Sequence, residues 1–257
     1  MNAGNQTYVR DRTIVLGGLV GLCLLAWLYL FYLVWMMDKM AVDMVMTEPQ
    51  VLSWTGTEVF FCFIMWAVMM VGMMIPSATP MIMVFSQTYR KRISQRKPYV
   101  PTSLFVFGYL VIWTAFSVIA TAIQWKLHTT ALLSPTLLKS TSPILGAVIL
   151  ITAGVYQWTD LKHRCLKHCQ SPLNFLLNEW RDGHAGAFVM GLRHGLYCLG
   201  CCWALMGLLF ITGVMNLLWV ALIGIFVLVE KLVPFERWIE RGVGGVLVAW
   251  GGMLLLV

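Results

Sequence analysis

Long apolar runs recur along this chain, and they restrict it to one class of structure. A run of about 17–25 apolar residues has the length of a membrane-spanning helix. Only a helix or a closed barrel satisfies its backbone hydrogen bonds inside lipid. Charged residues make up 11% of the chain and the mean hydropathy is +0.79, whereas soluble domains carry roughly 25% charged residues. The sequence therefore predicts an all-α, polytopic transmembrane helical bundle, with residues 1–257 forming one integral membrane domain.

We expect about seven spans in this bundle. The first run is too long for the core of a signal peptide and lacks a small-residue cleavage site, so it is expected to remain as a span. The fifth and sixth runs meet at Gly213 with almost no polar residue between them, which predicts a tight hairpin. The expected spans lie near residues 13–37, 59–85, 103–124, 143–158, 186–212, 215–230 and 242–257.

The distribution of Lys and Arg predicts how the bundle is oriented. With these seven spans, fourteen of the eighteen basic residues fall on the side of the N-terminus and three on the opposite side. The positive-inside rule then places the N-terminus in the cytoplasm and the C-terminus outside, across a bacterial cytoplasmic (inner) membrane. The net charge of +7 is therefore interpreted as a topology signal, and we expect no nucleic-acid partner.

The stretch MGLRHGLYCLGCCWALM carries the strongest chemical signal in the chain. On a helix, residues spaced by three or four lie above one another, so its His, Cys and Met side chains share one broad face. Thiolate and imidazole bind zinc or copper, and thioether sulfur favours Cu(I). The alternative for a single buried Cys is packing as a small apolar residue. The candidate ligands are Met190, His194, Cys198, Cys201, Cys202 and Met206.

A second candidate site lies in the run WAVMMVGMMIPSATPM. Met65, Met69 and Met73 form one i, i+4 row, and Met70 and Met74 form the next. Two prolines follow and are expected to interrupt the helix, as at the binding sites of many transporters. Met69, Met70, Met73 and Met74 are the proposed thioether ligands, and the alternative is ordinary membrane packing. Gly191, Gly195 and Gly200 leave room for a neighbouring helix, and we expect this Met-rich span to be that neighbour.

Two further clusters lie in expected loops. The outer loop after the first span, MMDKMAVDMVM, holds five Met residues between Met36 and Met46, and is either an interfacial helix end or a thioether trap for Cu(I). The expected cytoplasmic loop from Thr159 to Ala185 contains HRCLKHC. Its two nitrogen–sulfur pairs suit a metal but match no zinc-finger spacing, and the alternative is a basic loop beside anionic headgroups. Its candidate ligands are His163, Cys165, His168 and Cys169.

Glu230 and Arg193 are expected to support the central cluster. Counting residues away from the turn at Gly213 places Glu230 near the depth of Cys198 and His194. We expect Glu230 to accept a hydrogen bond from His194 or to pair with Arg193, which needs a partner at membrane depth. The alternative for Glu230 is an interfacial acid beside Lys231.

Four runs of this sequence together resemble a known family. They are WAVMMVGMMIPSATP, YQWTDLKHRCLKHCQSP, GLRHGLYCLGCCWALM and NLLWVALIGIFVLVEKLVP. The chain is similar over about Met65 to Pro234 to bacterial predicted metal-binding integral membrane proteins, a family filed as a domain of unknown function. The resemblance implies a metal-binding protein with several spans, and it implies no reaction.

Copper handling is the function that the ligand set favours. We expect a protein that is not an enzyme and that takes up, transfers or delivers Cu(I), with zinc as the alternative metal. Its partners would be the lipid bilayer, the metal ion and a metal-receiving membrane or soluble protein. Two alternatives remain open. The CxxC pair of Cys198 and Cys201 suits a membrane thiol-disulfide oxidoreductase, and the glycines of the last span suit a non-catalytic assembly subunit.

Overall fold

The computed structural model describes residues 3–44, 55–93, 101–130, 142–233 and 237–256. Every regular element in these ranges is a helix, which confirms the all-α expectation for the described part of the chain. The helices are α1 (Ala3–Met44), α2 (Gly56–Ile93), α3 (Thr102–Thr129), α4 (Pro143–Gln157), α5 (Asp160–Gln170), α6 (Pro172–Glu179), α7 (Gly183–Gly207), α8 (Leu209–Thr212), α9 (Leu217–Leu232) and α10 (Arg237–Leu256).

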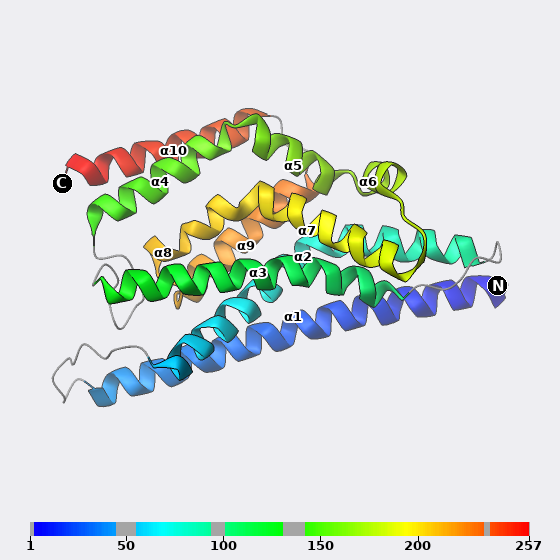
Figure 1. Ribbon diagram of the computed structural model, residues 1–257, viewed down its shortest axis with the longest axis horizontal. Helices are drawn as coiled ribbons and strands as arrows, with labels where there is room; N and C mark the ends of the chain where they lie inside the picture. The colour runs from blue at the N-terminus through cyan, green and yellow to red at the C-terminus, as the bar shows by residue number, and fades with distance from the viewer. Residues whose placement is uncertain (1–2, 45–54, 94–100, 131–141, 234–236, 257) are drawn as a thin grey trace.

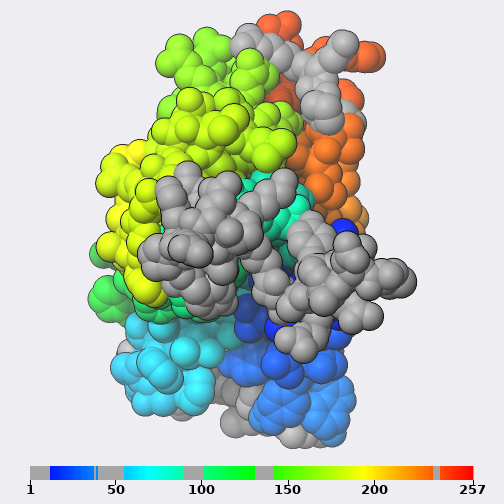
Figure 2. Space-filling model, turned by 90° about the vertical axis from the view of Figure 1, so that its right-hand side faces the viewer, coloured from blue at the N-terminus to red at the C-terminus, as the bar shows by residue number. Residues whose placement is uncertain are grey.

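The long helices run roughly side by side, and the two ends of the chain lie at opposite ends of the bundle (Figure 1). Helices α1 and α2 pack together along one edge, and α4 and α10 pack together along the other. Between these pairs lie α3, α7 and α9. Figure 2 looks at the bundle from the end where α1 begins and shows α1 and α2 below, α6 and α7 in the middle and α10 above. The middle helices carry the candidate site.

Within the described ranges, five helical segments are long and apolar enough to cross a membrane: Arg12–Met37, Gly56–Tyr89, Thr102–Thr129, Gly183–Thr212 and Trp238–Leu256. The expected count of seven is not confirmed. Helix α9 has 16 residues, so it measures about 24 Å, short of a hydrocarbon core of about 30 Å. Helix α4 has 15 residues, and it reaches membrane length only together with α5, at a bend of 65°.

Helix α2 continues through Pro76 and Pro80, so the expected interruption is wrong. A proline has no N–H, and the carbonyl four residues earlier loses its helical donor. For Pro76 this carbonyl belongs to Gly72, and the thiol of Cys23 on α1 donates to it at 3.5 Å. The neighbouring helix thus supplies a hydrogen-bond donor in place of the N–H that proline lacks. Donors from neighbouring helices are one way in which membrane helices tolerate proline.

Glycine lets α3 and α7 approach to backbone contact. A Cβ on Gly191 would lie 2.1 Å from the carbonyl oxygen of Phe105, and one on Gly108 would lie 2.3 Å from that of Phe188. Gly195 meets Ile112 in the same way. The neighbour at Gly191 and Gly195 is therefore α3, which corrects the expectation that the Met-rich α2 fills this place.

The segment expected as a loop between Thr159 and Ala185 folds into α5 and α6. Thr159 caps α5 by accepting a hydrogen bond from the backbone N–H of Lys162, and Pro172 begins α6 at a position where its missing N–H costs nothing. Gly183, with φ of +82°, then starts α7. The predicted turn at Gly213 is present, with φ of +91° between α8 and α9. Helix α5 is thereby placed against α7.

Candidate metal site

The sulfur-rich face of α7 is buried in the middle of the bundle. His194 and Cys201 are each 2% exposed, Cys202 is 1% exposed and Cys198 is fully buried. The helix places them on one face because their spacings are three and four residues. Within α7, the thiols of Cys201 and Cys202 donate to the carbonyl of Cys198 at 3.1 and 2.9 Å. The three sulfurs therefore gather around one turn of the helix.

Cys198 is the best-connected residue of this cluster. The ammonium of Lys231 on α9 donates to its sulfur at 2.9 Å and to the hydroxyl of Ser77 on α2, also at 2.9 Å. The hydroxyl of Tyr109 on α3 lies 3.1 Å from the same sulfur and 3.2 Å from the carbonyl oxygen of Met74, to which it donates. Helices α3 and α9 thus contact this thiol directly, and α2 contacts the two groups that do so. An adjacent ammonium stabilises a thiolate electrostatically.

Helix α5 adds a fourth cysteine to the cluster. Cys169 is buried, and its thiol interacts with the thiols of both Cys198 and Cys201. Cys202 interacts with the same two thiols from within α7. From the sequence, Cys169 was expected in a separate site formed by a loop. The structure instead brings it to the α7 cysteines, because Cys165 and Cys169 are four residues apart on one face of α5.

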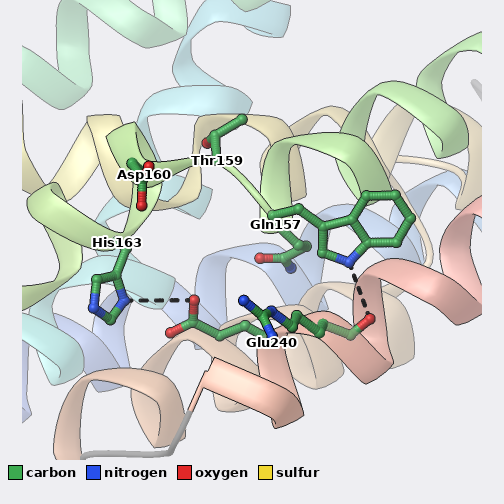
Figure 3. A pocket seen from close by; sticks show the side chains of 7 residues that line it. Gln157, Thr159, Asp160, His163 and Glu240 are labelled. Carbon is green, nitrogen blue, oxygen red and sulfur yellow. Dashed lines mark hydrogen bonds and ion pairs between the residues drawn. The ribbon is translucent and has the colours of Figure 1, made fainter.

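The two histidines of α5 contact residues other than the cysteines. His163 lies 3.8 Å from a carboxylate oxygen of Glu240 on α10. These two residues line a small polar pocket at the corner between α4 and α5, beside Gln157, Thr159 and Asp160 (Figure 3). The ring of His168 stacks on Tyr197 with centroids 4.1 Å apart. The two nitrogen–sulfur pairs stay a prediction.

His194 is held among aromatic rings one turn before Cys198. Its ring stacks on Tyr109 and Phe105 with centroids 5.6 and 5.9 Å apart, and Phe175 of α6 meets it edge-on at 5.6 Å. Its Nδ1 is buried and has no hydrogen-bond partner among the residues that the structure describes. Leaving a buried ring nitrogen without a partner is costly, and a metal ion could occupy this position. The ligand role of His194 stays a prediction.

Glu230 and Arg193 have partners other than those expected. Glu230 forms an ion pair with Lys162 of α5 at 2.6 Å, and its carbonyl accepts a hydrogen bond from Gln170. Lys162 also donates to Gln157. Arg193 pairs with Glu179 of α6. Among the described residues, neither hydrogen-bonds to His194. Each pair instead connects a short helix to the bundle. The Lys162–Glu230 pair is buried, where a charge needs an opposite charge, whereas the Arg193–Glu179 pair is partly exposed.

The Met residues of the proposed rows are buried, as expected for either packing or ligation. Met69, Met70, Met74, Met190 and Met206 are fully buried, and Met73 is 2% exposed and packs on Gly224 of α9. The backbone of Met74 contacts the hydroxyl that touches Cys198. In the outer Met cluster, α1 extends to Met44, and Met46 lies outside the described residues.

Within the described ranges, no three His, Cys, Asp or Glu side chains are already arranged as a metal-coordination shell. The thiols of the cluster are instead engaged with one another, with the carbonyl of Cys198 and with Lys231. The ligand roles of these residues therefore remain predictions.

Sequence reasoning missed three residues that surround Cys198: Ser77, Tyr109 and Lys231. Lys231 was counted among the cytoplasmic basic residues although it lies inside α9 and is 6% exposed. Lys231 stands between apolar residues in VLVEKLVP. This position indicates a buried cation, which requires a partner. Tyr109 and Ser77 carry no comparable signal.

The chain matches a known protein family. A family model described as PpoB2, copper chaperone, matches residues 63–254. This region contains α3 to α9 and most of α2 and α10, and so includes every residue of the cysteine cluster. No curated protein and no solved structure matches the chain.

Proposed function

This chain belongs to the PpoB2 copper chaperone family, and on that premise we propose that it binds Cu(I) as cargo at the four-cysteine cluster. The proposed ligands are Cys169, Cys198, Cys201 and Cys202, with His194 as a fifth candidate. The family is one of metal-handling proteins and not of enzymes, so the thiol oxidoreductase is not carried forward. The observation that carries the proposal is the convergence of α5 and α7 cysteines around a buried ammonium.

The donor set suits copper in its reduced state. Cu(I) is soft and prefers thiolate and thioether sulfur, whereas carboxylate and carbonyl oxygens suit harder ions. The sulfur of Cys198 contacts an ammonium and a phenol hydroxyl, and among the described residues it hydrogen-bonds to no carboxylate. Zinc also binds Cys and His, but it would leave the neighbouring Met rows without a role. Cu(I) is therefore the preferred cargo.

Lys231 supplies the charge that such a site needs. Cu(I) bound by two thiolates carries one net negative charge, which is costly to bury at membrane depth. The ammonium of Lys231 lies 2.9 Å from the sulfur of Cys198 and would balance this charge. The hydroxyl of Ser77 accepts a hydrogen bond from this ammonium, and the hydroxyl of Tyr109 lies 3.1 Å from the same sulfur.

We place the protein in the bacterial inner membrane with a cytoplasmic N-terminus. Five helices of membrane length and large apolar side chains exposed along α1, such as Leu25, Leu28 and Phe31, support contact with lipid. Because copper is held rather than converted, the function is uptake, transfer or delivery of Cu(I) to a receiving protein.

The test is the copper content of protein purified anaerobically under reducing conditions after growth with copper and zinc. Changing Cys198, Cys201 and Cys202 together to Ser is expected to abolish stoichiometric copper. A matched variant, Cys23→Ser with Cys62→Ser, removes two cysteines outside the cluster and should keep it. Equal copper in the triple variant and the wild type, or zinc in place of copper, would overturn the proposal.

A further inference from the structure

Helix α5 carries a second cysteine that lies at the edge of the buried cluster. Cys165 is four residues before Cys169 and only half-buried, whereas Cys169 and the α7 cysteines are buried. Its thiol packs against the backbone of Gly200, the residue before Cys201. The sulfurs therefore form a graded series, from the accessible Cys165 through Cys169 and Cys201 to the enclosed Cys198.

Gly200 is what allows Cys165 to reach α7. A Cβ at position 200 would lie 2.7 Å from the sulfur of Cys165, which is closer than real Cβ atoms come to any neighbour. The carbonyl of Gly200 accepts a hydrogen bond from the hydroxyl of Tyr156 on α4. Three helices, α4, α5 and α7, therefore meet at this glycine. Its missing side chain leaves the space that the thiol occupies.

The buried cluster has no other thiol of intermediate exposure beside it among the described residues. Cys23 is also half-buried, but it lies on α1 and donates to Gly72. Cys62 is buried on α2. A Cu(I) ion that passes between thiols needs a ligand that is exposed to the partner protein and also lies next to the buried site. Among the described cysteines, Cys165 alone is both partly exposed and next to the cluster.

We propose that Cys165 is the exchange thiol, and that Gly200 positions it, for the passage of thiol-bound Cu(I) between a partner and the buried cysteines. This inference rests on the proposed function. In the exchange, the sulfur of Cys165 forms one Cu–S bond as the partner's Cu–S bond breaks. The proton of the Cys165 thiol passes to the departing thiolate, and copper remains Cu(I) throughout. A second exchange hands the ion from Cys165 to Cys169 or Cys201, and the reverse sequence releases it.

The experiment measures the rate of Cu(I) transfer separately from the amount bound. Full-length protein in detergent is loaded anaerobically with Cu(I), and transfer to the chromophoric chelator bathocuproine disulfonate is followed by stopped flow. Cys165→Ser is expected to keep the wild-type stoichiometry and to slow transfer by about tenfold or more, since each 1.36 kcal/mol of added barrier is tenfold in rate. Cys23→Ser, the half-buried cysteine outside the cluster, is the matched control and should transfer at the wild-type rate.

Gly200→Ala provides a second, independent test that keeps every sulfur. The added methyl group is expected to displace the Cys165 thiol and to slow transfer, and combining it with Cys165→Ser should slow transfer no further. Gly207→Ala on the same helix is its control, because the nearest atom to a Cβ there is 3.9 Å away. Wild-type transfer rates in both variants would overturn the inference. Loss of bound copper in Cys165→Ser would also overturn it, by making Cys165 a resident ligand. Absence of copper from the wild type would instead overturn the proposed function.

Discussion

The ammonium of Lys231 lies 2.9 Å from the sulfur of Cys198, although 33 residues separate them in the sequence. Lys231 is 6% exposed and Cys198 is fully buried. Each therefore gives the other a polar partner inside an otherwise apolar bundle. This ammonium donates to a thiol and to a hydroxyl, and neither acceptor is a carboxylate. Among the residues that the structure describes, Lys231 is the only cation that contacts the cluster. The sulfur that it contacts lies at the centre of that cluster.

Replacing Lys231 with Leu should weaken Cu(I) binding without removing a sulfur ligand from the cluster or adding one. The variant keeps an aliphatic side chain but loses the charge that balances the thiolates, so the affinity should fall by roughly 10–100-fold, the equivalent of a charged hydrogen bond of about 1.5–3 kcal/mol. Competition with a chromophoric Cu(I) chelator measures the affinity. Lys126→Leu removes an exposed charge from the end of α3 and should leave the affinity unchanged. Wild-type affinity in Lys231→Leu would show that Lys231 does not balance the charge of the site.

The buried pair of Lys162 and Glu230 should matter for stability and not for copper. Their side chains are 0% and 4% exposed, and Glu230→Gln would leave the ammonium of Lys162 buried without its counter-charge. Breaking such a pair costs about 3–5 kcal/mol. Thermal unfolding in detergent should show the loss, while copper stoichiometry in the folded fraction stays at the wild-type value.

A compensating variant separates this ion-pair role from other effects. Combining Lys162→Met with Glu230→Leu removes both charges and should recover much of the stability lost in Glu230→Gln. A double variant as unstable as the single one would show that the ion pair is not the cause. Reduced copper binding by the folded Glu230→Gln variant would instead show that Glu230 supports the metal site.

Gly191→Ala should separate α3 from α7. The new Cβ would lie 2.1 Å from the carbonyl oxygen of Phe105, and backbone cannot yield as a side chain does. Overpacking of this kind costs about 1–3 kcal/mol or more. Tyr109, four residues after Phe105, would move with α3 and lose its contact with Cys198. We therefore expect a lower melting temperature together with weaker Cu(I) binding, whereas Gly17→Ala, at a position with nothing within 4 Å, should change neither.

The thioether rows can be tested without disturbing packing. Met73→Leu and Met74→Leu nearly conserve volume and should cost less than about 1.5 kcal/mol in stability. If these sulfurs bind Cu(I) beside the cysteines, the double variant should bind copper more weakly and lose sulfur scatterers in X-ray absorption. Met253→Leu, an exposed site on α10, is the control. An unchanged absorption spectrum would assign Met73 and Met74 to packing.

The local part of this structure could be predicted from the sequence, because it depends on residue spacing. The apolar runs predict helices, and the i, i+4 series from His194 to Cys202 predicts a single face, which the structure confirms as a buried surface of α7. The polar run HRCLKHC was assigned to a loop because it has no apolar run of membrane length. Its helix depends instead on the cap at Thr159, a signal that sequence reasoning did not use.

The surroundings of Cys198 could not be predicted in the same way, because they depend on which helices pack together. Gly191 and Gly195 predicted a close neighbour, but the identity of that neighbour follows from the matching glycine at Gly108 on α3. Counting depth from Gly213 placed Glu230 near the site, and the adjacent Lys231 is the residue that reaches it. A shift of one residue changes the helix face by about 100°, which depth alone does not resolve.

The order in which the chain is made has a consequence for this site. Its parts come from α2, α3, α5, α7 and α9, and Lys231 is the last of them to leave the ribosome. A nascent chain that contains α7 but not α9 has the cysteines without this ammonium. If the cluster binds Cu(I) as proposed, the charge that balances the bound ion is added only with α9, so a chain truncated before α9 should bind copper more weakly than one that contains it.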